Sequence, residues 1–403
     1  MPPRDLPTIL LVAEAVTLSH FARIATLART LDAASYRVVV ATDPRYVSLD
    51  STPISSLEPI ESVSSRQFGQ ALARGKPLYD ADTLSRYVEA DLALIDRIKP
   101  DLVVGDFRLS LSVSAPLRQI PYAAVVNAYW SPYADIAYPI PDLPLTRLLG
   151  VGIAQRLFDL VRPLAFARHA EPLNQVRRKY GLPALGRDLR RSYTWGDYTL
   201  YPDIPEIALM RDLPPNHRFL GPVLWSTDTP LPDWWSQVPQ DKPVVFLTLG
   251  SSGNADFLPE AVRVLAQLPI TLLVATVGKN LPMSLPDNVF HAEYLPLKAV
   301  LTRSQLLICN GGSLTTYQSI TCGVPVIGIC SNLDQLLNMA AMQRLGCGTT
   351  LRAGGLAPEK LAQATQIMLA TPVQSDAARQ LGKTLQHYDS AERFRASVAE
   401  ILS

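Results

Sequence analysis

Residues 306–320 read LLICNGGSLTTYQSI, and this stretch decides the fold class. It begins with four apolar residues typical of a buried strand, turns at Gly311 and Gly312, and continues in a helical pattern. A strand joined to a helix by a glycine turn is a unit of a doubly wound parallel sheet. The glycines let the backbone approach an anion, and Ser313, Thr315 and the first helical amides can donate hydrogen bonds to it. The stretch therefore predicts a diphosphate-binding turn, although glycines also occur at such turns for packing alone.

The same alternation of short apolar runs and helices occupies both halves of the chain. Strands are expected at residues 8–13, 37–42, 101–105, 122–126, 244–249, 270–275, 289–292, 306–309 and 326–329. A proline-rich passage without periodicity, residues 220–233, separates the halves. Such alternation covers both faces of a parallel sheet with helices. We therefore predict an α/β protein of two doubly wound domains, with ligands in a cleft where the carboxyl ends of both sheets face each other.

Composition limits the class of protein. A length of 403 residues predicts two or three domains, and 48% hydrophobic with 18% charged residues excludes a disordered chain. Thirty-seven basic and 36 acidic residues give a net charge of +1, so nucleic acid is not an expected partner. No apolar run approaches the roughly 18 residues of a membrane span, and the start lacks a secretory signal pattern, so the cytoplasm is the expected location.

The four cysteines do not form a recognisable metal or disulfide pattern. Cys309, Cys322, Cys330 and Cys347 contain no C-x-x-C pair, and two of them lie in strand-like apolar runs. We interpret them as buried thiols. No metal site is expected, and the sequence does not indicate an oligomeric state.

A block from residue 293 to 338 carries a more specific signal. Its motifs are EYLPLKAVL (293–301), the glycine turn, TCGVP (321–325) and NLDQLLN (332–338). Together they resemble the nucleotide-sugar signature of the family 1, UDP-glycosyltransferase-like enzymes of the GT-B architecture, of the bacterial macrolide and natural-product type. The resemblance covers essentially the whole chain and includes Leu249-Gly250-Ser251 and Phe219 to Pro222.

The resemblance implies a domain plan and a reaction. Residues 1–218 would form an acceptor-binding Rossmann-like domain and residues 219–389 a nucleotide-sugar-binding one. Residues 390–403 would form a helix that crosses back to the first domain. The implied enzyme is an inverting, metal-independent glycosyltransferase without a cofactor, whose co-substrate is a UDP- or dTDP-activated sugar.

The resemblance also assigns roles in the donor site. The glycine turn with Ser313 and Thr315 would hold the diphosphate, and Ser251 would face it. Tyr294 falls where an aromatic ring stacks on the base, and Leu295 where the backbone reads the base edge. Asp334 and Gln335 fall where the sugar hydroxyls are bound. Without the surrounding block, Tyr294 would be read as a core aromatic and Asp334 as a helix cap.

Two positions depart from the family pattern. The usual histidine before the glycine pair is Asn310, which keeps a neutral donor for a phosphate oxygen. The glutamate that normally accepts from both ribose hydroxyls is Gln318, which offers one acceptor oxygen and an NH2 group. An amide suffices for a single hydroxyl of the nucleotide's sugar, as in deoxyribose. A dTDP-sugar is therefore at least as plausible a donor as UDP-glucose.

His20 and Asp106 are the candidate catalytic pair. His20 follows the first strand at the start of a helix, and Asp106 follows the strand at 101–105, so both lie at carboxyl ends of strands. Both also match, in the resemblance, the family's catalytic histidine and its acidic partner. An acceptor hydroxyl needs a general base poised near neutrality, and imidazole meets that need with a carboxylate orienting the ring.

The acceptor side is less defined. Residues 127–201 look too rich in proline and turns to form one regular element. Aromatic residues gather there, and some should line an apolar pocket for a small lipophilic acceptor: Tyr129, Trp130, Tyr133, Tyr138, Phe158, Phe166 and Trp195. Basic residues also concentrate at 177–191. A solvated surface is the favoured interpretation of this stretch, and a peripheral membrane contact through anionic lipid is the alternative.

Two other functions remain open at this point. A sugar-nucleotide epimerase of the same architecture would need no acceptor site, and the His20–Asp106 pair argues against it. A non-catalytic nucleotide-sugar-binding partner protein is the second alternative, because Asn310 and Gln318 depart from the enzyme pattern.

Overall fold

The computed structural model describes the whole chain except residues 1–5, 51–53, 55, 240, 251–254 and 283. Its internal contacts divide the chain into two compact units. The first unit comprises residues 1–137, 156–223 and 388–403, and the second comprises residues 138–155 and 224–387. The contacts thus group residues 138–155 with the second unit, whereas the sequence places them within the first domain.

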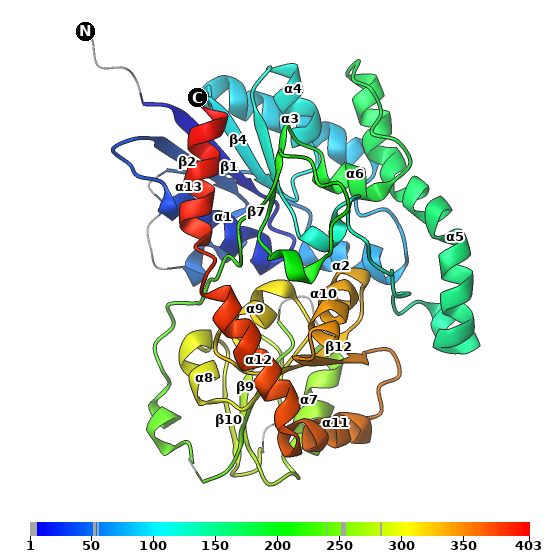
Figure 1. Cartoon of the computed structure of the whole chain (residues 1–403), viewed down its shortest axis with the longest axis vertical. Helices are drawn as coiled ribbons and strands as arrows, with labels where there is room; N and C mark the ends of the chain where they lie inside the picture. Colours follow the sequence, from blue (N-terminus) through cyan, green and yellow to red (C-terminus); the bar gives the residue numbers. More distant parts are fainter. Residues whose placement is uncertain (1–5, 51–53, 55, 240, 251–254, 283) are drawn as a thin grey trace. The chain divides into compact units, whose positions relative to one another are not determined.

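Within its described residues, the first unit contains a parallel sheet of seven strands in the order β3-β2-β1-β4-β5-β6-β7 (Figure 1). The strands are β1 (Thr8–Ala13), β2 (Arg37–Thr42), β3 (Leu57–Pro59), β4 (Leu102–Asp106), β5 (Tyr122–Val125), β6 (Tyr198–Tyr201) and β7 (His217–Phe219). The helices are α1 (Leu18–Thr30), α2 (Ser65–Ala73), α3 (Ala81–Ile98), α4 (Leu111–Leu117), α6 (Leu189–Thr194) and α13 (Ser390–Ile401), together with most of α5 (Pro144–Lys179).

Strand β1 is buried on both faces because its side chains alternate between two apolar clusters. Ile9 and Leu11 pack into the cluster that includes α1 and α13, whereas Leu10 and Val12 pack into the cluster that includes α3 and α4. After Thr8 the run TILLVA is apolar without interruption, as expected of a central parallel strand. Helix α13, red in Figure 1, inserts Phe394 into the first of these clusters.

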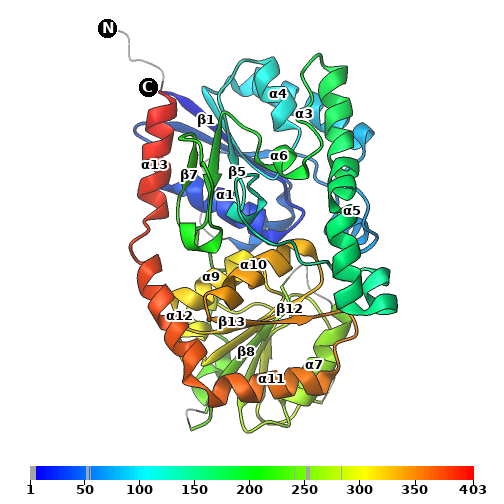
Figure 2. The same ribbon diagram turned by 45° about the vertical axis from the view of Figure 1, so that its right-hand side comes forward.

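The described residues of the second unit form a six-stranded parallel sheet in the order β10-β9-β8-β11-β12-β13 (Figure 2). Its strands are β8 (Val244–Thr248), β9 (Thr271–Ala275), β10 (Val289–Ala292), β11 (Leu306–Cys309), β12 (Val326–Cys330) and β13 (Gly348–Arg352). Its helices are α7 (Leu258–Leu265), α8 (Leu297–Arg303), α9 (Ser313–Thr321), α10 (Leu333–Arg344), α11 (Pro358–Ala370) and α12 (Pro372–Leu385).

Both sheets change winding direction beside their first strand. The order reverses between β1 and β4 in the first unit and between β8 and β11 in the second. In doubly wound sheets, ligands bind at the carboxyl ends of the strands at this switch point. Asp106 ends β4 and the glycine turn follows β11, so the candidate residues lie at the two switch points.

Residues 127–201 do not form one regular element, but they contain a long helix that the sequence did not predict. Helix α5 runs from Pro144 to Lys179 and departs from helical geometry at Gly150 (φ +70°). Pro163 and Pro172 lie inside the helix and conceal it in a sequence-based interpretation, since proline normally ends helices. Strands β3, β6, β7 and β13 were also not predicted from the sequence, and β3 and β7 have only three residues each.

Candidate active site

The first unit brings His20 and Asp106 into direct contact. Parallel pairing of β1 with β4 places Ala13 opposite Asp106, and the chain leaves β1 to begin α1 at Leu18. His20 therefore lies above the end of β4, with its Nδ1 atom 2.7 Å from Oδ1 of Asp106. Asp106 is fully buried, and His20 keeps partial access to solvent.

Arg23 completes this pair, and sequence reasoning missed it. It follows His20 by one helical turn, and its Nε donates to Oδ2 of Asp106 at 2.6 Å while its Nη2 donates to Oδ1 at 2.9 Å. Burial favours the neutral form of Asp106, but the charge of Arg23 and the hydrogen bonds from Arg23 and His20 outweigh it and hold the pKa of this carboxyl below its usual value. An arginine inside the apolar run Phe21-Ala-Arg-Ile24 was the available sequence signal.

The geometry assigns the tautomer of His20. Nδ1 lies within hydrogen-bond distance of both Asp106 Oδ1 (2.7 Å) and Arg23 Nη2 (3.1 Å). Because a carboxylate can only accept, the shorter contact requires Nδ1 to carry the proton, and Arg23 Nη2, which can only donate, then makes no hydrogen bond to this atom. In the neutral ring, Nε2 then keeps its lone pair and can accept a proton.

A second set of polar contacts fixes Arg23 from the far side. Its Nη1 donates to Oδ1 of Asn127 at 3.0 Å. Nδ2 of Asn127 donates to Asp203, and the amide of Ala128 donates to the same carboxylate at 2.6 Å. The Arg23 guanidinium is thus held in place by residues that follow β5 and β6.

Phe107 covers one face of the His20 imidazole. The two rings are stacked, with centroids 5.1 Å apart and planes 11° apart. Phe107 has a left-handed backbone (φ +61°), which costs a non-glycine residue about 1–3 kcal/mol. The neighbouring Arg108 is anchored by buried ion pairs to Glu14 and Asp91. Asp106, on the other side, is anchored by Arg23. The residues on both sides of Phe107 are therefore fixed, and they hold Phe107 in its strained backbone conformation.

An aromatic wall extends from Phe107. The ring of Tyr193 lies 5.1 Å from it and that of Phe68 lies 6.1 Å from it, both edge-on. Trp130 contacts Tyr193 at 5.0 Å, so this member of the predicted aromatic set belongs to the wall. Tyr133 packs on His217 instead, and Trp195 packs on Tyr122. Phe68 and Tyr193 were missed because isolated aromatic residues carry no periodic signal.

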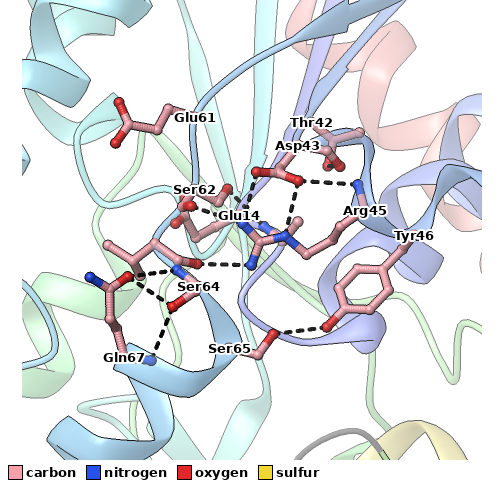
Figure 3. Close-up of polar contacts among 12 residues, drawn as sticks. Glu14, Thr42, Asp43, Arg45, Tyr46, Glu61, Ser62, Ser64, Ser65 and Gln67 are labelled. Atoms are coloured by element: carbon pink, nitrogen blue, oxygen red, sulfur yellow. Dashed lines mark hydrogen bonds and ion pairs between the residues drawn. The ribbon is translucent and has the colours of Figure 1, made fainter. Parts of the chain in front are cut away.

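Arg45 anchors the loop that precedes α2, the helix that contains Phe68 (Figure 3). Arg45 pairs with Asp43 and donates to the carbonyls of Ser62 and Val63 at 2.9 and 3.0 Å. The hydroxyl of Ser62 accepts from the amide of Ala15 at 3.1 Å. These contacts fix the loop against the ends of β1 and β2, immediately before α2 begins at Ser65.

In the second unit, the predicted glycine turn adopts a conformation that excludes side chains. Gly311 has φ +82°, and a Cβ atom there would stand 2.7 Å from both Cys330 Sγ and Met339 Cγ. Gly312 is the N-cap residue of α9 and has no side chain to cap the first amides. These amides and the positive end of the helix dipole suit an anion.

Several polar atoms beside this turn are buried without a partner. They are both terminal atoms of Gln318, Nε2 of Gln335 and Oδ1 of Asn338. The remaining atoms of two of these side chains are well bonded: Gln335 Oε1 accepts from the amide of Ser331, and Asn338 Nδ2 donates to the carbonyl of Gly311. Because buried polar groups are normally satisfied, this cluster indicates the place of a polar ligand.

Lys279 adds a cation that the sequence analysis did not identify. Its Nζ donates to the carbonyl of Gly250 at 2.8 Å. A Cβ atom on Gly250 would lie 3.4 Å from Nδ2 of Asn310, so the turn after β8 adjoins the turn after β11. Burial lowers the pKa of Lys279 to about 8.

The other predicted donor-site residues are distributed as follows. Ser313 is buried and Thr315 is half-buried in the first turn of α9, and Asp334 lies in the first turn of α10. Tyr294 is half-buried and Leu295 is buried in the connection between β10 and α8. Ser251 lies outside the described residues.

Comparison with known proteins identifies the family. The model for the Erythromycin biosynthesis protein CIII-like, C-terminal domain family matches residues 270–391. The PGL/p-HBAD biosynthesis glycosyltransferase of Mycobacterium tuberculosis is 47% identical over 394 residues, covering 96% of this chain and 92% of that protein. The PGL/p-HBAD biosynthesis rhamnosyltransferase of Mycobacterium bovis is also 47% identical, covering 96% and 88%. The chain belongs to the family 1 glycosyltransferases.

The fold of this glycosyltransferase agrees with the family. The structure of spinosyn rhamnosyltransferase SpnG complexed with thymidine diphosphate superimposes with a TM-score of 0.68 at 18% identity, covering 97% of this chain and 99% of that one. The predicted resemblance, the GT-B fold and the transferase activity are thereby confirmed.

Two further features of the glycosyltransferase bear on the sequence analysis. All four cysteines are free, and three of them are buried while Cys322 is exposed, so the prediction of four buried thiols is wrong at one position. Cys322 caps the end of α9 beside the glycine that follows, where it reaches the surface. Among the described residues, no helix has the length and apolar character needed to cross a membrane.

Proposed function

We propose that this glycosyltransferase moves a sugar from a dTDP- or UDP-activated donor to a hydroxyl of a small lipophilic acceptor, with inversion and without a metal ion. The observation that carries the proposal is the 2.7 Å contact between His20 Nδ1 and Asp106, reinforced by Arg23. It supports a role for His20 as general base and for Asp106 as the residue that orients the ring.

The proposed reaction is an in-line displacement. His20 Nε2 accepts the proton of the acceptor hydroxyl as its oxygen attacks the anomeric carbon of the donor. The bond from that carbon to the diphosphate oxygen breaks, and the diphosphate leaves with the electron pair. Asp106 stabilises the imidazolium that forms, and its ionised state is favoured by Arg23. Inversion follows from attack opposite the leaving group.

The leaving diphosphate would be stabilised by the second unit. We assign it to the Gly311–Gly312 turn, the first amides of α9, and the side chains of Ser313, Thr315 and Asn310. Lys279 is a further candidate for this role, because a lysine with a pKa near 8 is largely charged at neutral pH. Ser251 and Asp334 stay assigned to the diphosphate and to the donor sugar by the family resemblance.

We further propose that dTDP is the preferred nucleotide. Gln318 is buried, and both of its polar atoms lack a partner, so one amide is available to the sugar of the nucleotide. An amide provides one acceptor oxygen, which matches the single hydroxyl of deoxyribose better than the two of ribose. The names of two similar proteins favour a dTDP-activated deoxysugar as the donor. One is a rhamnosyltransferase, and the other is a rhamnosyltransferase complexed with thymidine diphosphate.

Calorimetry with dTDP and UDP tests the nucleotide assignment. The wild-type chain should bind dTDP more tightly than UDP. Gln318→Glu should shift the preference towards UDP, because a carboxylate can accept hydrogen bonds from both hydroxyls of ribose. Tight binding of UDP with no binding of dTDP would refute the assignment. Mass spectrometry of products with dTDP-rhamnose and a hydrophobic alcohol then tests the transfer itself, and activity confined to polar saccharide acceptors would contradict the acceptor class.

A further inference from the structure

Helix α5, green in Figure 2, carries a row of exposed apolar side chains, here called the stripe. Leu157, Leu160, Val161 and Leu164 are each more than a third exposed, and Leu160 reaches 79%. Their spacing of three and four residues places them along one side of the helix. Single exposed apolar residues are normal at protein surfaces, but a continuous row of large aliphatic side chains marks an interaction site.

The stripe is not the face by which α5 joins the protein. The opposite side of the helix is already packed, because Phe158, Phe166, Ala170 and Leu173 are all buried. A surface helix of a globular protein normally has one apolar side and one polar side. Helix α5 has an apolar side in the core and a second one facing outward.

The charge around the stripe indicates what binds it. Within residues 156–168 the helix contains three arginines and one acidic residue, Asp159, a net charge of +2. Arg156 and Arg168 are exposed and lie beside the stripe at helical spacing from Leu160 and Leu164. Aliphatic residues flanked by arginines fit a surface that is apolar inside and anionic at its rim.

We propose that this stripe docks the protein on an anionic lipid bilayer. The aliphatic side chains enter the boundary of the acyl chains, and Arg156 and Arg168 meet the lipid phosphates. A second copy of the chain is a poorer partner, because a two-fold contact through the same stripe would gather the arginines of both copies along one seam. The docked state would place a lipophilic acceptor and the enzyme at the same surface.

Vesicle flotation with the purified full chain tests this proposal. We expect flotation with phosphatidylcholine vesicles containing about one third phosphatidylglycerol, reduced by salt and weak with phosphatidylcholine alone. The double variant Leu160→Ser/Leu164→Ser should lower the partition coefficient about 100-fold, roughly tenfold for each leucine. Leu209→Ser is the matched control, since Leu209 is 60% exposed elsewhere in the first unit and should leave flotation unchanged.

Several outcomes overturn the proposal. They are no flotation with anionic vesicles, equal flotation of the double variant, and a dimer in light scattering that the double variant abolishes. An unchanged melting temperature establishes that the double variant is folded. If it is not folded, Arg156→Gln/Arg168→Gln serves as the second test, and undiminished preference of that variant for anionic vesicles contradicts the proposal.

Discussion

The two switch points of this glycosyltransferase differ in how their polar groups are satisfied. In the first unit, Asp106 accepts from Arg23 and His20, and Arg23 is bonded in turn to Asn127. In the second unit, Gln318 has no partner for either polar atom, and Gln335 lacks one for Nε2. The first site is therefore organised by the protein itself, whereas the second leaves polar atoms free for the donor that we propose to bind there. The difference separates catalysis from donor binding, and each prediction below changes one without the other.

The largest expected effect comes from removing the base. His20→Ala should lower kcat by about 10³-fold, because general base catalysis typically contributes 10²- to 10⁴-fold. Affinity for the nucleotide should not change, since every donor contact is assigned to the second unit. Steady-state kinetics with calorimetry measure both quantities. A parallel loss of nucleotide affinity would break the separation between the two sites.

Removal of Arg23 should be the next largest effect. Arg23→Met leaves the buried Asp106 without the charge that holds its pKa low, so that pKa rises and the carboxyl becomes neutral at a higher pH. We expect kcat to fall about 100-fold at neutral pH and the acid limb of the pH–rate profile to move upward. Arg23→Lys, which keeps the charge, should recover part of the activity. A uniform loss without a shifted profile would indicate a structural role alone.

Phe107 offers a smaller effect on the same site. Phe107→Ala removes the ring stacked on His20, so kcat should fall about tenfold with little change in the KM for the donor. Phe107→Tyr keeps the stacking and should restore most of the rate. Steady-state kinetics of both variants with the same acceptor distinguish the loss of stacking from general destabilisation. General destabilisation would lower the activity of the two variants alike.

In the donor site, Gln318→Ala should raise the KM for the donor about tenfold and leave kcat nearly unchanged. The reason is that a hydrogen bond to a sugar hydroxyl contributes about 1 kcal/mol or slightly more in the ground and transition states alike. Initial rates at varied donor concentration provide the test. A large fall in kcat would show that the two sites are not separable in this way.

The smallest expected effect concerns Lys279. Because burial lowers its pKa to about 8, its charge is present below that pH and is lost as the pH rises through it. The KM for the donor should therefore rise a few-fold between neutral pH and about pH 9. Lys279→Met should show the higher KM throughout and lose this dependence. An identical pH dependence in the variant would exclude Lys279 from the donor site.

The sequence predicted those parts of the structure that a local pattern specifies. Strands such as β1 and β11 are continuous apolar runs, and the glycine turn after β11 is a short motif, so both were predicted in the right place. His20 and Asp106 were also recognised, because strand ends meet at one edge of a parallel sheet. Their catalytic roles stay predictions.

Residues that act through distant partners could not be predicted. Arg23 meets Asp106 across 83 positions of sequence, and Lys279 meets Gly250 across 29. Phe107 depends on a left-handed backbone that nothing in its own sequence indicates. Such contacts arise from the packing of several elements, which no periodicity encodes. Helix α5 was missed for a different reason, since its prolines and glycines obscure a long helix.

Helix α13 has a consequence for the order in which the protein folds during synthesis. Phe394 and Val398 belong to the same apolar cluster as Ile24 and Leu27 of α1, the helix that carries His20. A ribosome that has finished the seven-stranded sheet must still translate residues 224–387, which are most of the second unit, before these two side chains exist. The nascent first unit therefore exposes these apolar side chains of α1 until α13 has been made, and its last stabilising contacts form after the second unit has been translated.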